Sequence, residues 1–202
     1  MLSLNSLISF NQDALMEEAG KLGNEEISQL VTWLELKEDK PRYHAFLLLK
    51  YRSEVDNSVY SYWDVFKSKL SSENSYQRSI GLMLIAENTK WDSDDRIKDT
   101  IKEYLRLLQD DKPITVRQCI QSLSDVIQYK QELTDLIADS LMSLKMETIK
   151  ETMRKLILMD SLGILIKINS QHKNPKIENY LFGILTGEIL DKKSKKLIEA
   201  QF

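Results

Sequence analysis

The sequence contains few of the residues that reactive sites and disulfides require. Among its 202 residues are one cysteine, Cys119, and two histidines, His44 and His172, which lie 128 positions apart. A single cysteine excludes a disulfide within the chain, and because Cys119 falls inside an apolar helical pattern we expect a buried structural thiol. Two distant histidines do not supply the ligand spacing of a Cys/His metal site. The sequence therefore predicts no metal site.

Motifs for nucleotide, acyl and calcium chemistry are also missing. The chain has no glycine-rich phosphate loop and no Ser-His-Asp set. The acidic run from Trp91 to Asp95 lacks the glycine and the distal glutamate of a calcium loop, and it directly precedes a helical pattern that starts at Arg96. We interpret this run as a helix cap. The sequence thus predicts no catalytic residue and no cofactor, and we expect a protein that is not an enzyme.

Helix breakers and long apolar runs are scarce. Six glycines and three prolines in 202 residues leave few interruptions, and no useful stretch alternates with a period of two. The longest apolar tract, from Leu156 to Ile168, contains Asp160 and Lys167 and is too short to cross a bilayer. Nothing at the N-terminus resembles a signal peptide. We therefore expect an all-α protein of the cytoplasm that does not bind a membrane.

No single sign of charge dominates the chain. Its net charge is −3, with 12 basic and 17 acidic side chains in residues 1–100 against 16 and 14 in residues 101–202. Binding along a nucleic-acid duplex needs many clustered basic residues, so this balance disfavours nucleic acid as a partner. Four lysines, Lys192, Lys193, Lys195 and Lys196, lie near the C-terminus. We expect residues 192–202 to form a basic tail, solvated or frayed.

What the sequence does contain is an arginine that recurs at a nearly constant interval. Arg42, Arg78, Arg117 and Arg154 are separated by 36, 39 and 37 positions, and each opens an apolar helical pattern. Offsets three and seven from these arginines hold apolar or small residues, namely Ala45 and Leu49, Gly81 and Ile85, Ile120 and Ser124, and Ile157 and Ser161. A second amphipathic stretch follows each pattern after a polar turn. This period predicts one helix-pair unit used repeatedly.

Repeated helix pairs predict an α-solenoid, in which each pair stacks on the next. The first 39 residues do not fit the repeat. They contain an amphipathic pattern from Ile27 to Leu34 that follows Gly20 and Gly23. Because the end of a stack must face water, we interpret residues 1–39 as an N-terminal helical cap. The remainder to residue 202 belongs to the same single domain.

One of the four units resembles a known repeat family. The segment from Asp110 to Arg117 reads Asp-Asp-Lys-Pro-Ile-Thr-Val-Arg, and apolar residues follow at Ile120 and Leu123. An acidic-Pro turn and a Val-Arg pair before two apolar helices are typical of a HEAT repeat, and the other units resemble the family through period and pattern. The resemblance implies a right-handed α-solenoid of about four to five antiparallel helix pairs, over about residues 40 to 190. It also implies a role in protein recognition.

Two groups of residues are candidates for binding a partner. The four arginines, if they align along one edge of the stack, offer spaced donors to carboxylates or phosphates. Alternatively, each arginine pairs with an acid or a carbonyl of the adjoining repeat, with candidates in Asp110, Asp111, Asp125 and Asp160. Aromatic residues crowd the span 43–91, and we expect Tyr60 and Tyr62 to be its exposed pair.

The sequence leaves three hypotheses for function. The first is a non-catalytic scaffold or adaptor that binds another protein or a peptide on a concave helical surface. The second is a HEAT-like DNA-repair glycosylase, or another nucleic-acid-binding repeat protein, which needs a basic face around Trp33, Trp63 or Trp91. The third is an accessory factor for cofactor assembly, for which cysteine and histidine are too scarce. The sequence favours the scaffold and leaves the oligomeric state open.

Overall fold

The described part of the chain is helical throughout. A computed structural model describes residues 2–200, apart from the side chains of residues 12 and 13. Within these residues the regular elements are α-helices and short 3-10 helices, and no strand occurs. The expected all-α class is confirmed. The chain divides between Thr100 and Ile101 into two compact units.

The first unit is built around one long helix, α4. Its elements are α1 (Leu4–Ser9), α2 (Gln12–Ala19), α3 (Asn24–Trp33), α4 (Asp39–Val55), the 3-10 helix η1 (Asn57–Tyr62), α5 (Trp63–Lys69), α6 (Ser75–Asn88), η2 (Thr89–Trp91) and the start of α7 (Arg96–Arg106). The helices α1, α2 and α3 all pack against α4. These three helices occupy the segment that the sequence analysis assigns to a cap.

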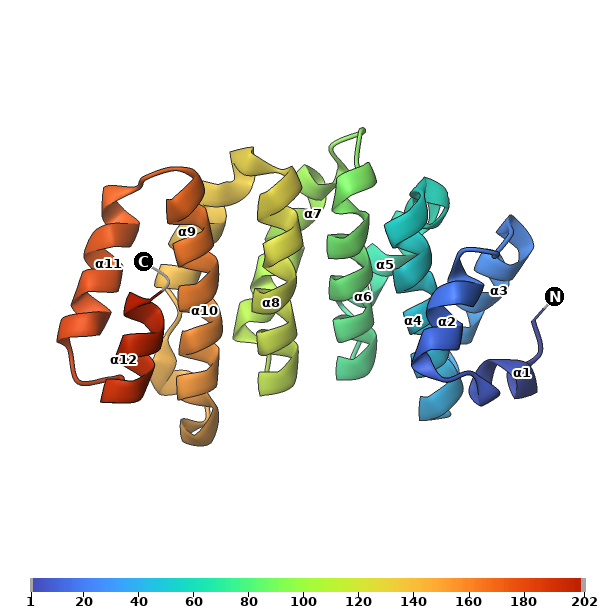
Figure 1. Cartoon of the computed structure of the whole chain (residues 1–202), viewed down its shortest axis with the longest axis horizontal. Helices are drawn as coiled ribbons and strands as arrows, with labels where there is room; N and C mark the ends of the chain where they lie inside the picture. The colour runs from blue at the N-terminus through green and yellow to red at the C-terminus, as the bar shows by residue number, and fades with distance from the viewer. Residues whose placement is uncertain (1, 201–202) are drawn as a thin grey trace. The chain divides into compact units, whose positions relative to one another are not determined.

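In the same unit, α4 and α6 lie side by side with their N-terminal ends at the same edge (Figure 1). The short helix α5 packs closely on α6, and Gly81 is the reason that it can do so. A Cβ atom on residue 81 would lie 2.7 Å from the carbonyl oxygen of Phe66. Trp63, at the start of α5, is fully buried and donates its indole N–H to the Thr100 hydroxyl at 3.1 Å.

The second unit is arranged around α10. It contains the end of α7, η3 (Leu107–Gln109), α8 (Pro113–Tyr129), η4 (Gln131–Leu133), α9 (Thr134–Met142), η5 (Met146–Thr148), α10 (Glu151–Gln171), α11 (Pro175–Thr186) and α12 (Lys192–Glu199). The 21-residue α10 packs against α8, α9, α11 and α12. Helices α8 and α10 lie side by side with their N-terminal ends at the same edge, as α4 and α6 do in the first unit (Figure 1).

Helix starts follow the local sequence signals. Pro41, Pro113 and Pro175 all lie in the first turns of α4, α8 and α11, where a missing backbone N–H costs nothing. At α7 the Asp92 carboxylate accepts the backbone N–H groups of Arg96 and Ile97 at 2.9 and 3.0 Å. The prediction that the acidic run from Trp91 to Asp95 caps the following helix is thereby confirmed.

No group of three or more His, Cys, Asp or Glu residues within the described chain is arranged to hold a metal ion.

The predicted apolar stripes form the core of both units. Ala45, Leu49, Ile85, Ile120 and Ile157 have no exposed surface, whereas Ser124 at the corresponding position is half-buried. Cys119 is fully buried as expected, and this burial raises the pKa of its thiol.

The predicted basic tail is largely helical. Of the predicted basic tail, residues 192–199 form the helix α12, which buries Ser194 and Ile198, while residues 201–202 lie outside the described part. No helix in the described residues is long and apolar enough to cross a membrane.

Candidate binding site

Arg42 and Arg78 fold back onto the turn that precedes their own helix. Arg42 donates from one guanidinium nitrogen to the carbonyl oxygens of Leu36 and Lys37, at 2.9 and 3.2 Å. Arg78 donates to the carbonyl oxygens of Ser72 and Glu73, both at 2.9 Å. In each case the carbonyls belong to residues six and five positions earlier. Both arginines are buried, with 7% and 9% of their surface exposed.

Arg154 repeats this contact in the second unit. It donates to the carbonyl oxygens of Ile149 at 2.8 Å and Glu147 at 3.1 Å, five and seven positions earlier, although its side chain is exposed. Three of the four recurring arginines thus close the turn before a long helix. The alternative expected a partner in the adjoining repeat, whereas these three arginines bond to carbonyls of the turn before their own helix. Only Arg117 reaches one of the expected acids, Asp160.

Arg42 makes two further contacts. Besides the two carbonyls, it forms an ion pair with Asp39, and its guanidinium lies over the ring of Tyr76 with the central carbon 5.3 Å from the ring centroid. Tyr76 belongs to the first turn of α6. The guanidinium therefore occupies the space between the turn before α4 and the N-terminal end of the next long helix.

Arg117 is the exception. Its guanidinium does not contact the turn before α8 but pairs with Asp160 of α10, at 2.6 Å from Nε and 3.3 Å from an Nη atom. The side-chain amide of Gln121 donates to the same carboxylate at 3.2 Å. The ion pair raises the pKa of the Arg117 guanidinium, which therefore stays fully charged.

A pocket lies beside the turn before α8. It has a volume of about 630 Å³ and is lined by residues of two connections: Leu108, Gln109, Asp110, Asp111, Pro113 and Val116 around the start of α8, and Leu144, Lys145, Thr148, Ile149, Lys150 and Ile157 around the start of α10. All of these residues belong to the second unit. The pocket therefore lies between one turn and the N-terminal end of the next long helix, which is the relation that the Arg42 guanidinium has to its surroundings.

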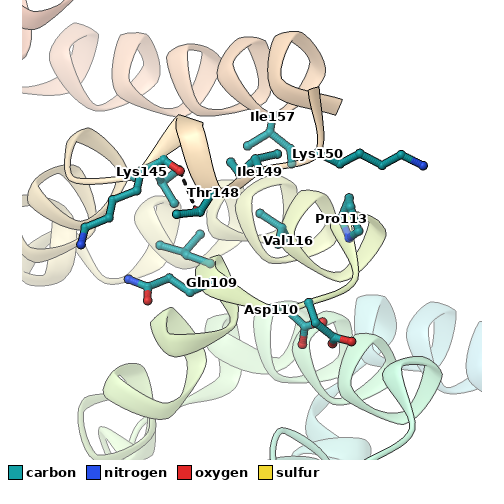
Figure 2. Close-up of a pocket in the computed structure, with 12 residues that line it drawn as sticks. Gln109, Asp110, Pro113, Val116, Lys145, Thr148, Ile149, Lys150 and Ile157 are labelled. Carbon is teal, nitrogen blue, oxygen red and sulfur yellow. Dashed lines mark hydrogen bonds between the residues drawn. The ribbon is translucent and has the colours of Figure 1, made fainter. Parts of the chain in front are cut away.

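The pocket combines an apolar centre with a charged rim. Figure 2 shows Val116, Ile149 and Ile157 around the centre and the Asp110 carboxylate at one edge. The ammonium groups of Lys145 and Lys150 extend away from the centre on opposite sides (Figure 2). The lining contains no histidine, cysteine or serine. These side chains can bind a partly apolar group and orient its charges, but they include no activated nucleophile.

The aromatic residues differ from the sequence-based expectation. Tyr60 and Tyr62 are half-buried, whereas Tyr43 and Tyr76 are 57% and 63% exposed. The expectation that Tyr60 and Tyr62 form the exposed pair is therefore wrong. The cause is a tertiary contact, because the Tyr60 hydroxyl donates to the Asp92 carboxylate at 2.8 Å, and the ring packs edge-on against Trp63. Burial and the Asp92 carboxylate together raise the pKa of Tyr60.

Trp91 and His44 contact backbone carbonyl oxygens of the first unit. Trp91 donates its indole N–H to the carbonyl oxygen of Ser53 at 2.7 Å, and Trp63 is buried. His44 places its Nδ1 atom 2.7 Å from the carbonyl oxygen of Leu7, and His172 is exposed at the end of α10. Trp63 is therefore enclosed in the first unit, whereas Trp33 and Trp91 are half-buried.

Sequence reasoning did not identify the pocket, although one signal was present. The connection between α9 and α10 carries apolar residues, Leu144, Met146 and Ile149, in a segment where a solvated turn is usually polar. Apolar residues in a connection indicate a surface that is covered by another segment of the chain or by a binding partner.

No protein-family model matches the sequence, and no curated protein shows a significant match.

Proposed function

We propose that this protein is a non-catalytic scaffold or adaptor that binds another protein or a peptide. We further propose that its helices form one right-handed α-solenoid of HEAT-like helix pairs, about four to five in number, with residues 1–39 as the cap. The recurrence of one arginine-to-turn contact at Arg42, Arg78 and Arg154 supports a repeated unit. Repeat proteins of this kind commonly bind extended partners along a series of equivalent turns.

The observation that carries the proposal is the pocket at the start of α8 and α10. Its volume of about 630 Å³ accommodates a few side chains, and its apolar centre with a charged rim matches the anatomy of a small protein-recognition site. The lining contains no histidine, cysteine or serine, so it cannot form a Ser-His or Cys-His pair. Binding without chemical conversion is the function that such a lining supports.

The alternative of a DNA-repair glycosylase has no specific observation in its favour. It requires a basic face around an accessible tryptophan for the flipped base. Trp63 is 1% exposed, and Trp33 and Trp91 are half-buried. We therefore do not propose a glycosylase function.

A screen of a randomised peptide library against the full chain tests the proposal. We expect enriched peptides whose affinity falls at least about tenfold in Ile149→Asp, because a carboxylate placed in the apolar centre must be desolvated when the peptide binds. Ile114→Asp is the matched control, since Ile114 is 54% exposed in the same unit and does not line the pocket. Bound peptides should be recovered uncleaved.

The proposal is contradicted if no enriched peptide loses affinity for the variant with an altered pocket. Circular dichroism of both variants confirms that they are folded. If Ile149→Asp unfolds, Thr148→Arg replaces it, because Thr148 is exposed at the pocket and a long side chain there blocks entry. Enrichment that survives in Thr148→Arg also contradicts the proposal.

A further inference from the structure

Helix α11 buries one side within the second unit. It contacts α9 and α10, and its apolar residues Ile177 and Leu181 are fully buried. In Figure 1 it forms an edge of the second unit, with α9 and α10 on its inner side. Four exposed residues share another side of the helix, because they are spaced by three, one and three positions: Asn179, Phe182, Gly183 and Thr186. We call these four residues the outer face of α11.

The outer face places a large apolar side chain next to a residue without one. Phe182 is 69% exposed. Apart from its chain neighbours and its own helix backbone, no described atom lies within 4 Å of the position that a Cβ atom on Gly183 would take. Glycine inside a helix costs about 1 kcal/mol relative to alanine. No close contact within the described residues requires this glycine, so the space beside it is open to a second molecule.

The outer face is complementary to itself. A two-fold axis that relates two antiparallel α11 helices and passes between residues 182 and 183 places Phe182 of each chain opposite Gly183 of the other. Each ring then fills the space left by a missing side chain, as ridges fill grooves between packed helices. We propose that α11 binds α11 of a second copy of this chain in this antiparallel arrangement, so that the protein forms a two-fold dimer.

The polar residues of the outer face match under the same symmetry. The axis places Asn179 of each chain opposite Thr186 of the other. The Thr186 hydroxyl donates to the carbonyl oxygen of Phe182 at 2.9 Å, so its own oxygen is an acceptor for a further donor. The Asn179 side-chain amide supplies such a donor. The polar rim of the contact is therefore satisfied without a second kind of partner.

The charges at the two ends of α11 favour the antiparallel orientation. Lys176 lies in the first turn and its side chain is 72% exposed, while the exposed Glu188 follows the last turn. Lys176 lies 3.5 Å from Asp139, but both side chains are more than half exposed, so this pair contributes little and can rearrange. Antiparallel helices bring Lys176 of each chain near Glu188 of the other, whereas parallel helices bring like charges together.

Such a dimer changes what the scaffold can bind. The pocket at the start of α8 and α10 has no lining residue from α11, so the dimer contact does not use the pocket residues. Two copies of the pocket are then present in one particle. A partner with two binding segments gains affinity from this arrangement, because its second segment binds from within the complex.

Analytical ultracentrifugation of the full chain tests the proposal. We expect a concentration-dependent equilibrium between one and two chains. Phe182→Asp should raise its dissociation constant at least about tenfold, because a carboxylate between two helices must be desolvated. Ile114→Asp is the matched control and should leave the constant unchanged, since Ile114 is 54% exposed in the same unit and belongs to α8.

Gly183→Leu separates the proposed contact from general apolar attraction. The substitution adds apolar surface to the outer face, yet we expect it to weaken the dimer at least about tenfold, because leucine occupies the space that the Phe182 ring of the second copy needs. Circular dichroism should show an unchanged fold, because a Cβ atom at this position meets no neighbour.

Cross-linking tests the antiparallel register. Asn179→Cys and Thr186→Cys are prepared separately, mixed and treated with a mild oxidant. We expect disulfides between the two variants to form faster than disulfides within either variant alone, because the symmetry places residue 179 opposite residue 186. The native Cys119 is fully buried, so the introduced thiols are the ones that react.

Several results would overturn the inference. These are a chain that stays single at every concentration, a dimer that Phe182→Asp leaves intact, and a dimer that Gly183→Leu strengthens. Cross-linking that is as fast within either variant alone as in the mixture also overturns the antiparallel arrangement. None of these results affects the peptide-binding proposal, which depends on the pocket variants.

Discussion

At the residue scale, the four recurring arginines have two different roles. Arg42, Arg78 and Arg154 each bond to carbonyls of the turn before their helix, so they fix the angle at which the chain enters it. Arg117 joins two neighbouring helices through Asp160 instead. Arg42, Arg78 and Arg154 lie four residues after the N-caps of their helices, whereas Arg117 lies five residues after Lys112, which turns its side chain to another side of the helix.

Burial decides how much each arginine contributes to stability. In Arg78→Ala the carbonyls of Ser72 and Glu73 lose charged donors in a partly buried contact, so we expect the free energy of unfolding to fall by about 1–3 kcal/mol. Arg154→Ala is the matched variant, since its carbonyl contacts are exposed and water replaces the lost donors, giving a change of about 0.5 kcal/mol or less.

Urea denaturation of the two variants measures both values. Arg78→Lys provides a further check, because an ammonium keeps the charge but cannot reproduce the planar donor pattern. If Arg78→Ala and Arg154→Ala change stability equally, the turn-closing role assigned to the buried arginines is wrong.

At the element scale, the contact between α5 and α6 depends on a residue that lacks a side chain. Gly81 lies within α6, where alanine is ordinarily the better helix former. Its missing Cβ lets the backbone of α5 approach, with the Phe66 carbonyl oxygen and the Lys69 Cβ within 3.0 Å of the position that a Cβ would take. The spacing of α5 and α6 therefore follows from this one position.

We expect Gly81→Ala to lower the free energy of unfolding by about 1–3 kcal/mol, because the backbone of α5 must move to admit a methyl group. Gly163→Ala in α10 is the control. Nothing lies within 4 Å of a Cβ placed there, so the gain in helix propensity should raise stability by up to about 1 kcal/mol. Thermal denaturation of both variants tests the opposite signs, and destabilisation of both would show that helix geometry rather than the α5 contact is responsible.

Element positions were largely predictable from the sequence, and their side-chain partners were not. The arginine period and the apolar offsets located α4, α6, α8 and α10, and the prolines marked three first turns. Periodicity describes which face of a helix is apolar, so it succeeds wherever one face is buried. It failed for Tyr60, whose exposure depends on Asp92, a residue 32 positions away. Periodicity also did not indicate that Arg117 contacts a neighbouring helix while the other three arginines contact the turn before their own helix.

At the scale of the whole molecule, the chain forms two compact units that share one helix. Residues 96–100 of α7 belong to the first unit and residues 101–106 to the second. The prediction that residues 1–202 fold as a single repeat domain requires both units to unfold together. A shared helix favours this behaviour, because melting either unit removes tertiary support from part of α7.

The distribution of tryptophan allows a direct test of that prediction. All three tryptophans, Trp33, Trp63 and Trp91, belong to the first unit, so tryptophan fluorescence reports on that unit alone. Far-ultraviolet circular dichroism reports on helices in both. For a single domain we expect the same urea midpoint from the two probes. Separate midpoints would show that the units unfold independently and would refute the single-domain prediction.

The sequence alone determined the all-α class, the helix period, the helix starts and the buried position of Cys119, because each follows from local pattern and composition. The tertiary structure decided which turns are closed by an arginine, which tyrosines face solvent and where the pocket lies. These features depend on pairs such as Arg117 with Asp160, 43 positions apart. The pairing of two distant side chains is fixed by how helices pack, and helical periodicity carries no information about it.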